Sequence, residues 1–249
     1  MQIQQLTGIG KRESNQDFIC IERLGSGAAF FLITDGMGGY EKGDDAARIV
    51  SENIFTFLNY VESVNEQNIQ KAVQKANLAL KQFNIKNNIK SGATIGGIII
   101  EKNISHIFWV GDVMVYQINK DKVLFQTKSH TLVNSLLESN SIKKEKSLER
   151  YKHIVTRSIS GKPSESHIGY QSIQFSEDDT FIICSDGVHN NISIEQILPY
   201  SNQENGLQEL ERQFLKEAQD NFTIIAIKDI DDFSLLKKEN NKRIKGNIS

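Results

Sequence analysis

Apolar and polar positions along the chain follow two different periods, and the change of period predicts which segments are strands and which are helices. Apolar residues at three-and-four spacing predict amphipathic helices over 44–61, 67–83, 193–198 and 207–219, with a brief helical segment over 129–137. Asn65 is the expected N-cap of the second helix. Short apolar runs between turn residues predict strands over 18–24, 28–34, 93–101, 104–110, 113–119, 122–127, 153–159, 171–175, 180–184 and 222–228.

The spacing of these runs predicts how some strands pair. Gly25-Ser26-Gly27 turns the chain between the first two predicted strands, so Asp17 and Asp35 are expected near the same end of a sheet. The four runs between 93 and 127 are separated only by turn residues, which predicts a meander of antiparallel strands. No repeat and no linker divides the chain, which favours one domain over 1–232 followed by a basic, polar tail over 233–249.

Composition and charge narrow the class of protein. The 249 residues are 39% hydrophobic and 24% charged, as in ordinary globular proteins, and the net charge of −2 offers no footprint for nucleic acid or a membrane. The N-terminus begins polar, and the longest apolar runs fall short of the roughly 20 residues that a spanning helix needs. Cys20 and Cys184 lie in separate apolar runs and are expected to be reduced core thiols. A cytoplasmic monomer is predicted.

Four aspartates share one position relative to the predicted strands. Asp35, Asp112 and Asp186 each follow an apolar run, and Asp220 precedes one. An Asp-Gly pair after a strand is usually only a turn, but here the pattern recurs. Because the end of one antiparallel strand lies beside the start of its neighbour, all four carboxylates can meet at one edge of the core. Clustered carboxylates repel one another, so such a site is stable only with bound cations.

The residue types of this cluster favour hard cations. The five histidines are scattered, and no cysteine and histidine cluster has ligand spacing, so Mg²⁺ or Mn²⁺ is expected rather than zinc. Two ions that share an aspartate would lower the pKa of a water and bind a phosphoryl oxygen. Arg12, although most arginines of this kind are merely exposed, is the candidate for bidentate binding of phosphate near Asp17.

Six motifs occur in an order and spacing that resemble the metal-dependent protein phosphatases of the 2C type, in their compact bacterial form. They are Arg12-Glu13-Ser14-Asn15-Gln16-Asp17, Asp35-Gly36-Met37-Gly38-Gly39, Ser91-Gly92-Ala93-Thr94, Gly111-Asp112, Ser185-Asp186-Gly187 and Asp220-Asn221-Phe222-Thr223. The resemblance runs from about residue 5 to residue 228. It implies an α+β fold, a four-layer α-β-β-α sandwich of two antiparallel sheets flanked by helix pairs, with the metals at one end.

The resemblance also implies a set of metal ligands. Asp35 would bridge two Mn²⁺ or Mg²⁺ ions, and the carbonyl of Gly36 would bind one of them. Asp186 and Asp220 would hold the second ion. Asp112 would be the candidate ligand of a third, weaker ion.

The activity that the resemblance implies is hydrolysis of phosphoserine and phosphothreonine in proteins, opposing a serine/threonine kinase. Arg12 would bind the phosphate, and Asp17 would orient a water on the ions bridged by Asp35, which attacks without a covalent phosphoenzyme. The chain has no Cys-x5-Arg loop, which argues against a cysteine nucleophile. Residues 136–152 fall where the family carries its flap, and their basic character suggests contact with a phosphorylated, acidic segment of a protein.

Several positions depart from the family pattern. Gly111-Asp112-Val113-Met114 stands for Gly-Asp-Ser-Arg, Gln16 stands for an acid, and Ser129 stands for an aspartate. Met37 stands where many eukaryotic members carry a histidine, so protonation of the leaving group is expected from metal-bound water. These departures leave open a catalytically weakened or inactive phosphatase-fold module that binds or regulates. A regulatory phosphatase acting on a partner-switching antagonist would keep the same acids and usually adds a sensor domain.

Overall fold

The computed structural model describes residues 1–37, 42–139, 151, 153–162, 165–203 and 205–230, without the side chains of residues 213 and 217. Most of the predicted flap, residues 140–150 and 152, lies outside the described residues, as does the predicted basic tail. None of the described helices is long and apolar enough to cross a membrane.

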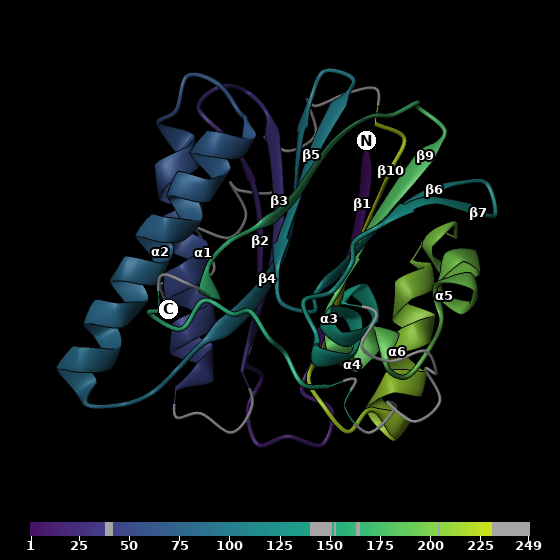
Figure 1. Cartoon of the computed structure of the whole chain (residues 1–249). Helices are drawn as coiled ribbons and strands as arrows, with labels where there is room; N and C mark the ends of the chain where they lie inside the picture. The colour runs from purple at the N-terminus through teal and green to yellow at the C-terminus, as the bar shows by residue number, and fades with distance from the viewer. Residues whose placement is uncertain (38–41, 140–150, 152, 163–164, 204, 231–249) are drawn as a thin grey trace, which may run out of the picture.

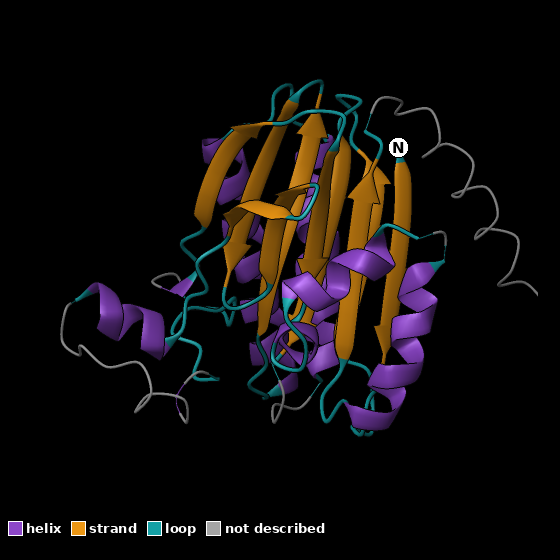
Figure 2. Ribbon diagram, turned by 90° about the vertical axis from the view of Figure 1, so that its right-hand side faces the viewer, coloured by secondary structure: helices purple, strands orange, loops and turns teal. Residues whose placement is uncertain are grey.

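Two antiparallel sheets form the centre of the fold (Figure 1). The strands of the first sheet are, in spatial order, β1 (Gln2–Gly8), β10 (Phe222–Lys228), β9 (Asp179–Cys184), β6 (Met114–Asn119) and β7 (Lys122–Gln126). The strands of the second are β2 (Asp17–Arg23), β3 (Ala29–Gly36), β4 (Ala93–Glu101), β5 (Ile104–Val110) and β8 (Gly169–Gln174). Figure 2 shows these strands side by side, with helices in front of and behind them.

Pairs of helices cover the outer faces of the two sheets (Figure 1). Helices α1 (Gly43–Asn59) and α2 (Glu66–Asn87) lie on the second sheet, and α5 (Ile194–Ser201) and α6 (Gly206–Glu217) lie on the first. Two shorter helices, α3 (Leu132–Glu138) and α4 (Asp186–His189), lie near the ends of strands. This arrangement confirms the predicted four-layer sandwich.

Burial on both faces explains why strand β3 reads as a continuous apolar run. Its Phe30 and Leu32 pack among side chains of α1 and α2, whereas Phe31 and Ile33 point the other way, into the layer between the sheets. Alternate side chains of a strand point to opposite faces, so a strand with helices on one side and a sheet on the other needs apolar residues throughout. The same alternation holds in β10, where Ile225 and Ile227 face the second sheet.

The predicted helices and several strand boundaries are confirmed. Asn65 caps α2, because its side-chain oxygen accepts a hydrogen bond from the backbone N–H of Asn68 at 2.9 Å. Strands β4, β5 and β10 have the predicted bounds. Strand β1 was not predicted, because its sequence, QIQQLTG, is polar at most positions.

The predicted meander over 93–127 is wrong. Strands β4 and β5 pair with each other, and so do β6 and β7, but β6 pairs on its other side with β9 in the first sheet. The chain therefore crosses from one sheet to the other between β5 and β6, at Gly111-Asp112. Each short turn is compatible with a hairpin or with a crossover, and only the packing of the two sheets distinguishes them.

The predicted strand over 153–159 is also wrong. Among the described residues, this segment makes only two isolated bridges, Val155 with Thr131 and Ile159 with Ala93. Its backbone bonds are divided between separate elements, since the N–H of Thr156 donates to the carbonyl of His130 at 2.8 Å. The segment therefore connects the loop before α3 to the start of β4 through hydrogen bonds and does not extend either sheet.

Candidate metal centre

The four strand-end aspartates meet at one end of the sandwich. Asp35, Asp112, Asp186 and Asp220 all line a single pocket of about 280 Å³. Its other lining residues are Arg12, Gly36, Met37, Thr94, His153 and Val155. The predicted convergence of the four aspartates is confirmed, and Arg12 lies among them.

Asp17 and Asp35 face each other across the β2–β3 pair. They are register partners at the last position of the ladder, as the predicted hairpin requires. Ser185 Oγ donates to Asp17 Oδ2 at 2.9 Å, while Asp17 Oδ1 is buried without a hydrogen-bond partner among the described residues. Burial, followed by repulsion from Asp220, raises the pKa of Asp17 to about 6. An unpartnered buried oxygen is therefore available to accept a hydrogen bond.

The turn after Asp35 leaves no room for a side chain. A Cβ atom on Gly36 would lie 2.4 Å from the carbonyl oxygen of Gly43, where α1 begins. The N–H of Gly36 donates to the carbonyl of Gln16 at 3.0 Å, which ties the turn to the loop before β2. Burial, and then repulsion from Asp17 and other aspartates, raises the pKa of Asp35 well above its usual range.

Asp112 lies at the crossover between the sheets, and two histidines hold that crossover in place. The backbone N–H and ring Nδ1 of His130 bond the carbonyl and the N–H of Gly111, at 2.7 and 3.1 Å. Gly111 has φ +100°, and a Cβ there would meet Thr94 at 2.3 Å. The ring N–H of His189, on α4, donates to the carbonyl of Asp112 at 3.0 Å. Burial raises the pKa of the Asp112 carboxyl.

Helix α4 places Asp186 in the pocket. Asp186 is its first residue, directly after strand β9, and the helix was not predicted because it is only four residues long. Burial, and then repulsion from Asp112 and Asp220, raises the pKa of Asp186 to about 7. The raised pKa values of Asp17, Asp35, Asp112 and Asp186 have the same largest cause, which is burial of each carboxylate.

Arg12 binds Asp220 directly. Its Nη2 lies 2.6 Å from Asp220 Oδ2, and the side chains are 46% and 37% exposed. The neighbouring Asn221 anchors the loop that carries Arg12, since its amide donates to the carbonyls of Ile9 and Ser14 at 2.9 Å each. Asn221 Oδ1 also accepts from the N–H of Gln16 at 3.0 Å.

The donor set fits hard divalent cations. It consists of oxygen atoms, burial and neighbouring carboxylates raise the pKa values of Asp35 and Asp186, and Asp17 Oδ1 lacks a partner among the described residues. Within the described part of the chain, no three acidic, histidine or cysteine side chains are grouped so that they could hold an ion as they stand. The Arg12–Asp220 ion pair is one difference from a metal-bound site, because the guanidinium contacts the Asp220 Oδ2 atom that a cation would bind.

Sequence reasoning missed several residues around the site. His153 lines the pocket with the aspartates, whereas His130 and His189 hold the Gly111-Asp112 turn. Asn221 is part of the Asp220-Asn221-Phe222-Thr223 motif, but no role was predicted for its side chain. No signal marked the histidines, because their spacing along the chain is irregular; the Asp-Asn pair before a buried strand was the only hint for Asn221.

Two departures from the family pattern lie in one place. Met114 and Ser129 both line a pocket of about 290 Å³ beside Asp112 and His189. The sequence carries uncharged residues at these two positions, where the family pattern has an arginine and an aspartate. The two changes together leave the formal charge of these two positions the same as that of an arginine and an aspartate.

A two-sheet sandwich with clustered aspartates and an arginine at one end defines the class of metal-dependent phosphatases. The model of the family described as protein phosphatase 2C matches residues 7–222. The chain belongs to the protein phosphatase 2C family and is a serine/threonine phosphatase by class.

Known relatives agree with this assignment. A putative protein phosphatase of Mycoplasma pneumoniae is 30% identical over 196 residues, which cover 72% of this chain and 74% of that protein. A serine/threonine phosphatase of Listeria innocua is 27% identical over 210 residues, covering 79% of this chain and 82% of that protein.

Solved structures share the fold. The serine/threonine phosphatase of S. agalactiae superposes with a TM-score of 0.82 at 23% identity, covering 91% of this chain and 98% of that one. The catalytic domain of the phosphatase PstP, solved in complex with two manganese ions, gives a TM-score of 0.75 at 22% identity, covering 90% and 96%.

Proposed function

We propose that this phosphatase hydrolyses phosphoserine and phosphothreonine in proteins by direct attack of a water at a binuclear Mn²⁺ or Mg²⁺ centre. The observation that carries the proposal is the convergence of four strand-end aspartates and Arg12 on one pocket. The two manganese ions in the related PstP domain support the same stoichiometry.

The proposed ligands come from both sheets. Asp35 and the Gly36 carbonyl belong to β3, whereas Asp186 and Asp220 lie at the adjoining ends of β9 and β10. When bound, two such ions lower the pKa of a coordinated water and neutralise phosphoryl oxygens. Asp112, at the crossover, would serve a third and weaker ion.

Arg12 and Asp17 act on the substrate and on the water. The Arg12 guanidinium exchanges Asp220 for the phosphate oxygens, which match its planar pair of donors. Asp17 Oδ1, buried without a partner among the described residues, accepts a hydrogen bond from the attacking water and orients it toward phosphorus. A new P–O bond forms as the bond to the serine or threonine oxygen breaks, and that oxygen takes its proton from water.

The partners follow from this chemistry. The substrate is a phosphorylated protein, and the chain acts as a monomer that reverses the action of a serine/threonine kinase. An inactive binding module is the alternative, but no proposed ligand is replaced in this chain, and the departures at Gln16, Val113 and Met114 spare them all.

Hydrolysis of p-nitrophenyl phosphate and of a phosphothreonine peptide with added Mn²⁺ or Mg²⁺ tests the proposal. EDTA and Asp186→Ala should each abolish hydrolysis of both substrates. The matched control is Asp178→Ala, which removes an exposed aspartate near the start of β9 and should leave the rate unchanged. A folded protein that is inert with both metals would refute the proposed function.

A further inference from the structure

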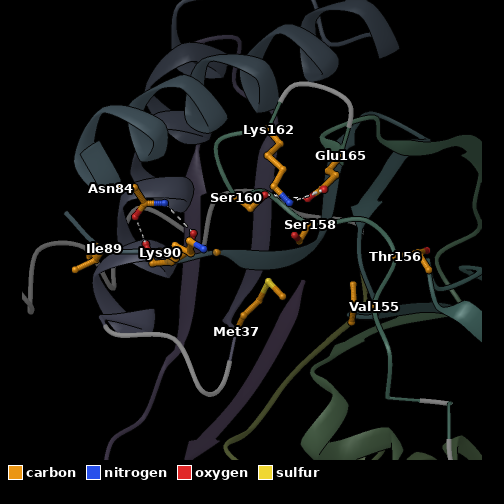
Figure 3. Close-up of a pocket in the computed structure, with 12 residues that line it drawn as sticks. Met37, Asn84, Ile89, Lys90, Val155, Thr156, Ser158, Ser160, Lys162 and Glu165 are labelled. Atoms are coloured by element: carbon orange, nitrogen blue, oxygen red, sulfur yellow. Dashed lines mark hydrogen bonds and ion pairs between the residues drawn. The ribbon is translucent and has the colours of Figure 1, made fainter. Parts of the chain in front are cut away.

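A pocket larger than the one lined by the four aspartates opens beside it. It encloses about 480 Å³ between the loop that follows α2 and the described residues 155–162 and 165. Met37 and Val155 line both pockets, so the two spaces share a wall. In Figure 3, Met37 lies between Lys90 on one side and Val155 on the other.

The loop wall of this pocket is held by the end of α2. The Asn84 amide donates to the carbonyl of Ser91 at 2.9 Å, and Ser91 Oγ donates back to Asn84 Oδ1 at 2.6 Å. Asn88 ends the helix with φ 53°, the left-handed conformation that asparagine tolerates. These contacts fix the positions of Ile89 and Lys90 at the edge of the pocket.

The opposite wall is anchored to the same part of the fold. Ile159 exchanges two backbone hydrogen bonds with Ala93, each 2.9 Å long, at the start of β4. The N–H of Gly161 donates to the buried side chain of Asn77, on α2, at 2.7 Å. Because both walls are fixed to α2 and β4, the pocket is formed before any ligand binds.

The charge of this pocket is opposite to that of its neighbour. Lys162 and Glu165 offset each other through an ion pair of 2.9 Å. Lys90 is exposed and makes no ion pair with any described residue, so the lining carries an excess positive charge. Hydroxyl groups complete the polar lining, from Ser91, Thr156, Ser158 and Ser160.

We infer that this pocket receives an acidic side chain of the substrate, close in sequence to the phosphorylated residue. The inference rests on the proposed function and adds a sequence preference to it. A polypeptide whose phosphate lies among the aspartates passes the shared wall at Met37 and Val155, where its neighbouring side chain meets Lys90. Lys90 is a lining residue whose charge no described partner offsets, so an acidic side chain is favoured in this pocket.

The test compares two phosphothreonine peptides that differ only in carrying glutamate or lysine at the positions flanking the phosphothreonine. The wild-type protein should favour the glutamate peptide in kcat/KM by about fivefold, the upper range for an exposed charge pair. Lys90→Glu should abolish or reverse this preference. Glu165→Gln, which removes a negative charge but keeps the shape of the side chain, should increase it.

Two controls separate this inference from the proposed function. Lys86→Glu makes the same charge change on an exposed residue of α2 outside the pocket and should behave as wild type. All variants should hydrolyse p-nitrophenyl phosphate at the wild-type rate, because it lacks a flanking residue. Equal kcat/KM for the two peptides, or an unchanged preference in Lys90→Glu, would overturn the inference while p-nitrophenyl phosphate is still hydrolysed. Loss of hydrolysis of all substrates in the wild type would overturn the proposed function itself.

Discussion

The guanidinium of Arg12 donates a hydrogen bond to Asp220 Oδ2 at 2.6 Å, which joins the proposed phosphate-binding residue to a proposed metal ligand. The two residues are 208 positions apart and meet because the loop before β2 and the turn before β10 lie at the same end of the sandwich. A cation bound to Asp220 would take the place of Arg12, and a phosphate bound to Arg12 would take the place of Asp220. Metal binding and phosphate binding are therefore expected to favour each other.

Arg12→Ala should separate these two roles. Loss of the charged contact with phosphate should lower kcat/KM for the phosphothreonine peptide by about 10- to 100-fold, mainly through KM. Mn²⁺ affinity, measured by calorimetry, should stay the same or increase, because a competing cation has left Asp220. Arg48→Ala, an exposed arginine paired with Asp45 on α1, is the control. Weaker Mn²⁺ binding in Arg12→Ala would contradict the assignment.

The metal-free protein should be less stable at pH 8 than at pH 5. The pKa values of Asp17 and Asp186 are raised in the folded state, to about 6 and about 7, from an ordinary 3.8. Between those values the folded state holds protons that the unfolded state has released, so stability falls as the pH rises. Between pH 5 and pH 8, Asp17 alone would account for a loss of about 1.4 kcal/mol, because its folded-state pKa of about 6 lies one unit above pH 5 and each unit is worth 1.36 kcal/mol.

Urea unfolding in EDTA at the two pH values measures this loss. Excess Mn²⁺ should restore stability at pH 8, because the ions bind the ionised carboxylates of the folded state. Asp17→Asn should reduce the pH dependence of the metal-free protein. A free energy of unfolding that rises between pH 5 and pH 8 without metal would show that the pKa values of these carboxylates are not raised in the folded state.

Asp112→Ala should affect turnover more than tight metal binding. Asp112 lies at the crossover between the sheets, and it lines the pocket without belonging to the proposed binuclear set. We expect kcat to fall while calorimetry with Mn²⁺ still shows two tightly bound ions. Asp121→Ala, in the exposed turn between β6 and β7, serves as the matched control. If the variant no longer binds two ions, the third-ion assignment fails.

Asn221→Ala should destabilise the site loop. The Asn221 side chain makes three hydrogen bonds to the backbone of residues 9–16, and their loss leaves partly buried backbone groups without these partners. A decrease of about 1–3 kcal/mol in the free energy of unfolding is expected, together with a higher KM through displacement of Arg12. Asn87→Ala, an exposed asparagine on α2, should change neither quantity. Unchanged stability and KM in Asn221→Ala would show that the loop is held by other contacts.

Local patterns predicted most of the fold. Buried faces produce the three-and-four spacing of apolar residues in α1 and α2 and the continuous apolar run of β3. Such spacing can be recognised from residues that are close together in the sequence. Short or polar elements were missed for the same reason. Helix α4 is a single turn, and β1 alternates glutamine with isolated apolar residues.

The aspartates of the site were also predictable, but their contacts were not. Asp35 lies at the end of β3, and Asp112 and Asp186 follow β5 and β9, so the place of each at a strand end is a local property. The ion pair of Asp220 with Arg12 and the bond of His189 to Asp112 join residues far apart in the chain. The spacing of histidines along the sequence therefore carried no signal.

The sequence by itself determined the elements, the strand-end carboxylates and the family resemblance, because side-chain period and motif order are properties of neighbouring residues. Only the tertiary structure decided that β5 and β6 belong to different sheets and that residues 153–159 connect the loop before α3 to the start of β4. It also decided that a lysine-bearing pocket opens beside the aspartates. These features depend on which distant surfaces pack together, and a short turn or an exposed lysine fits several such packings equally well.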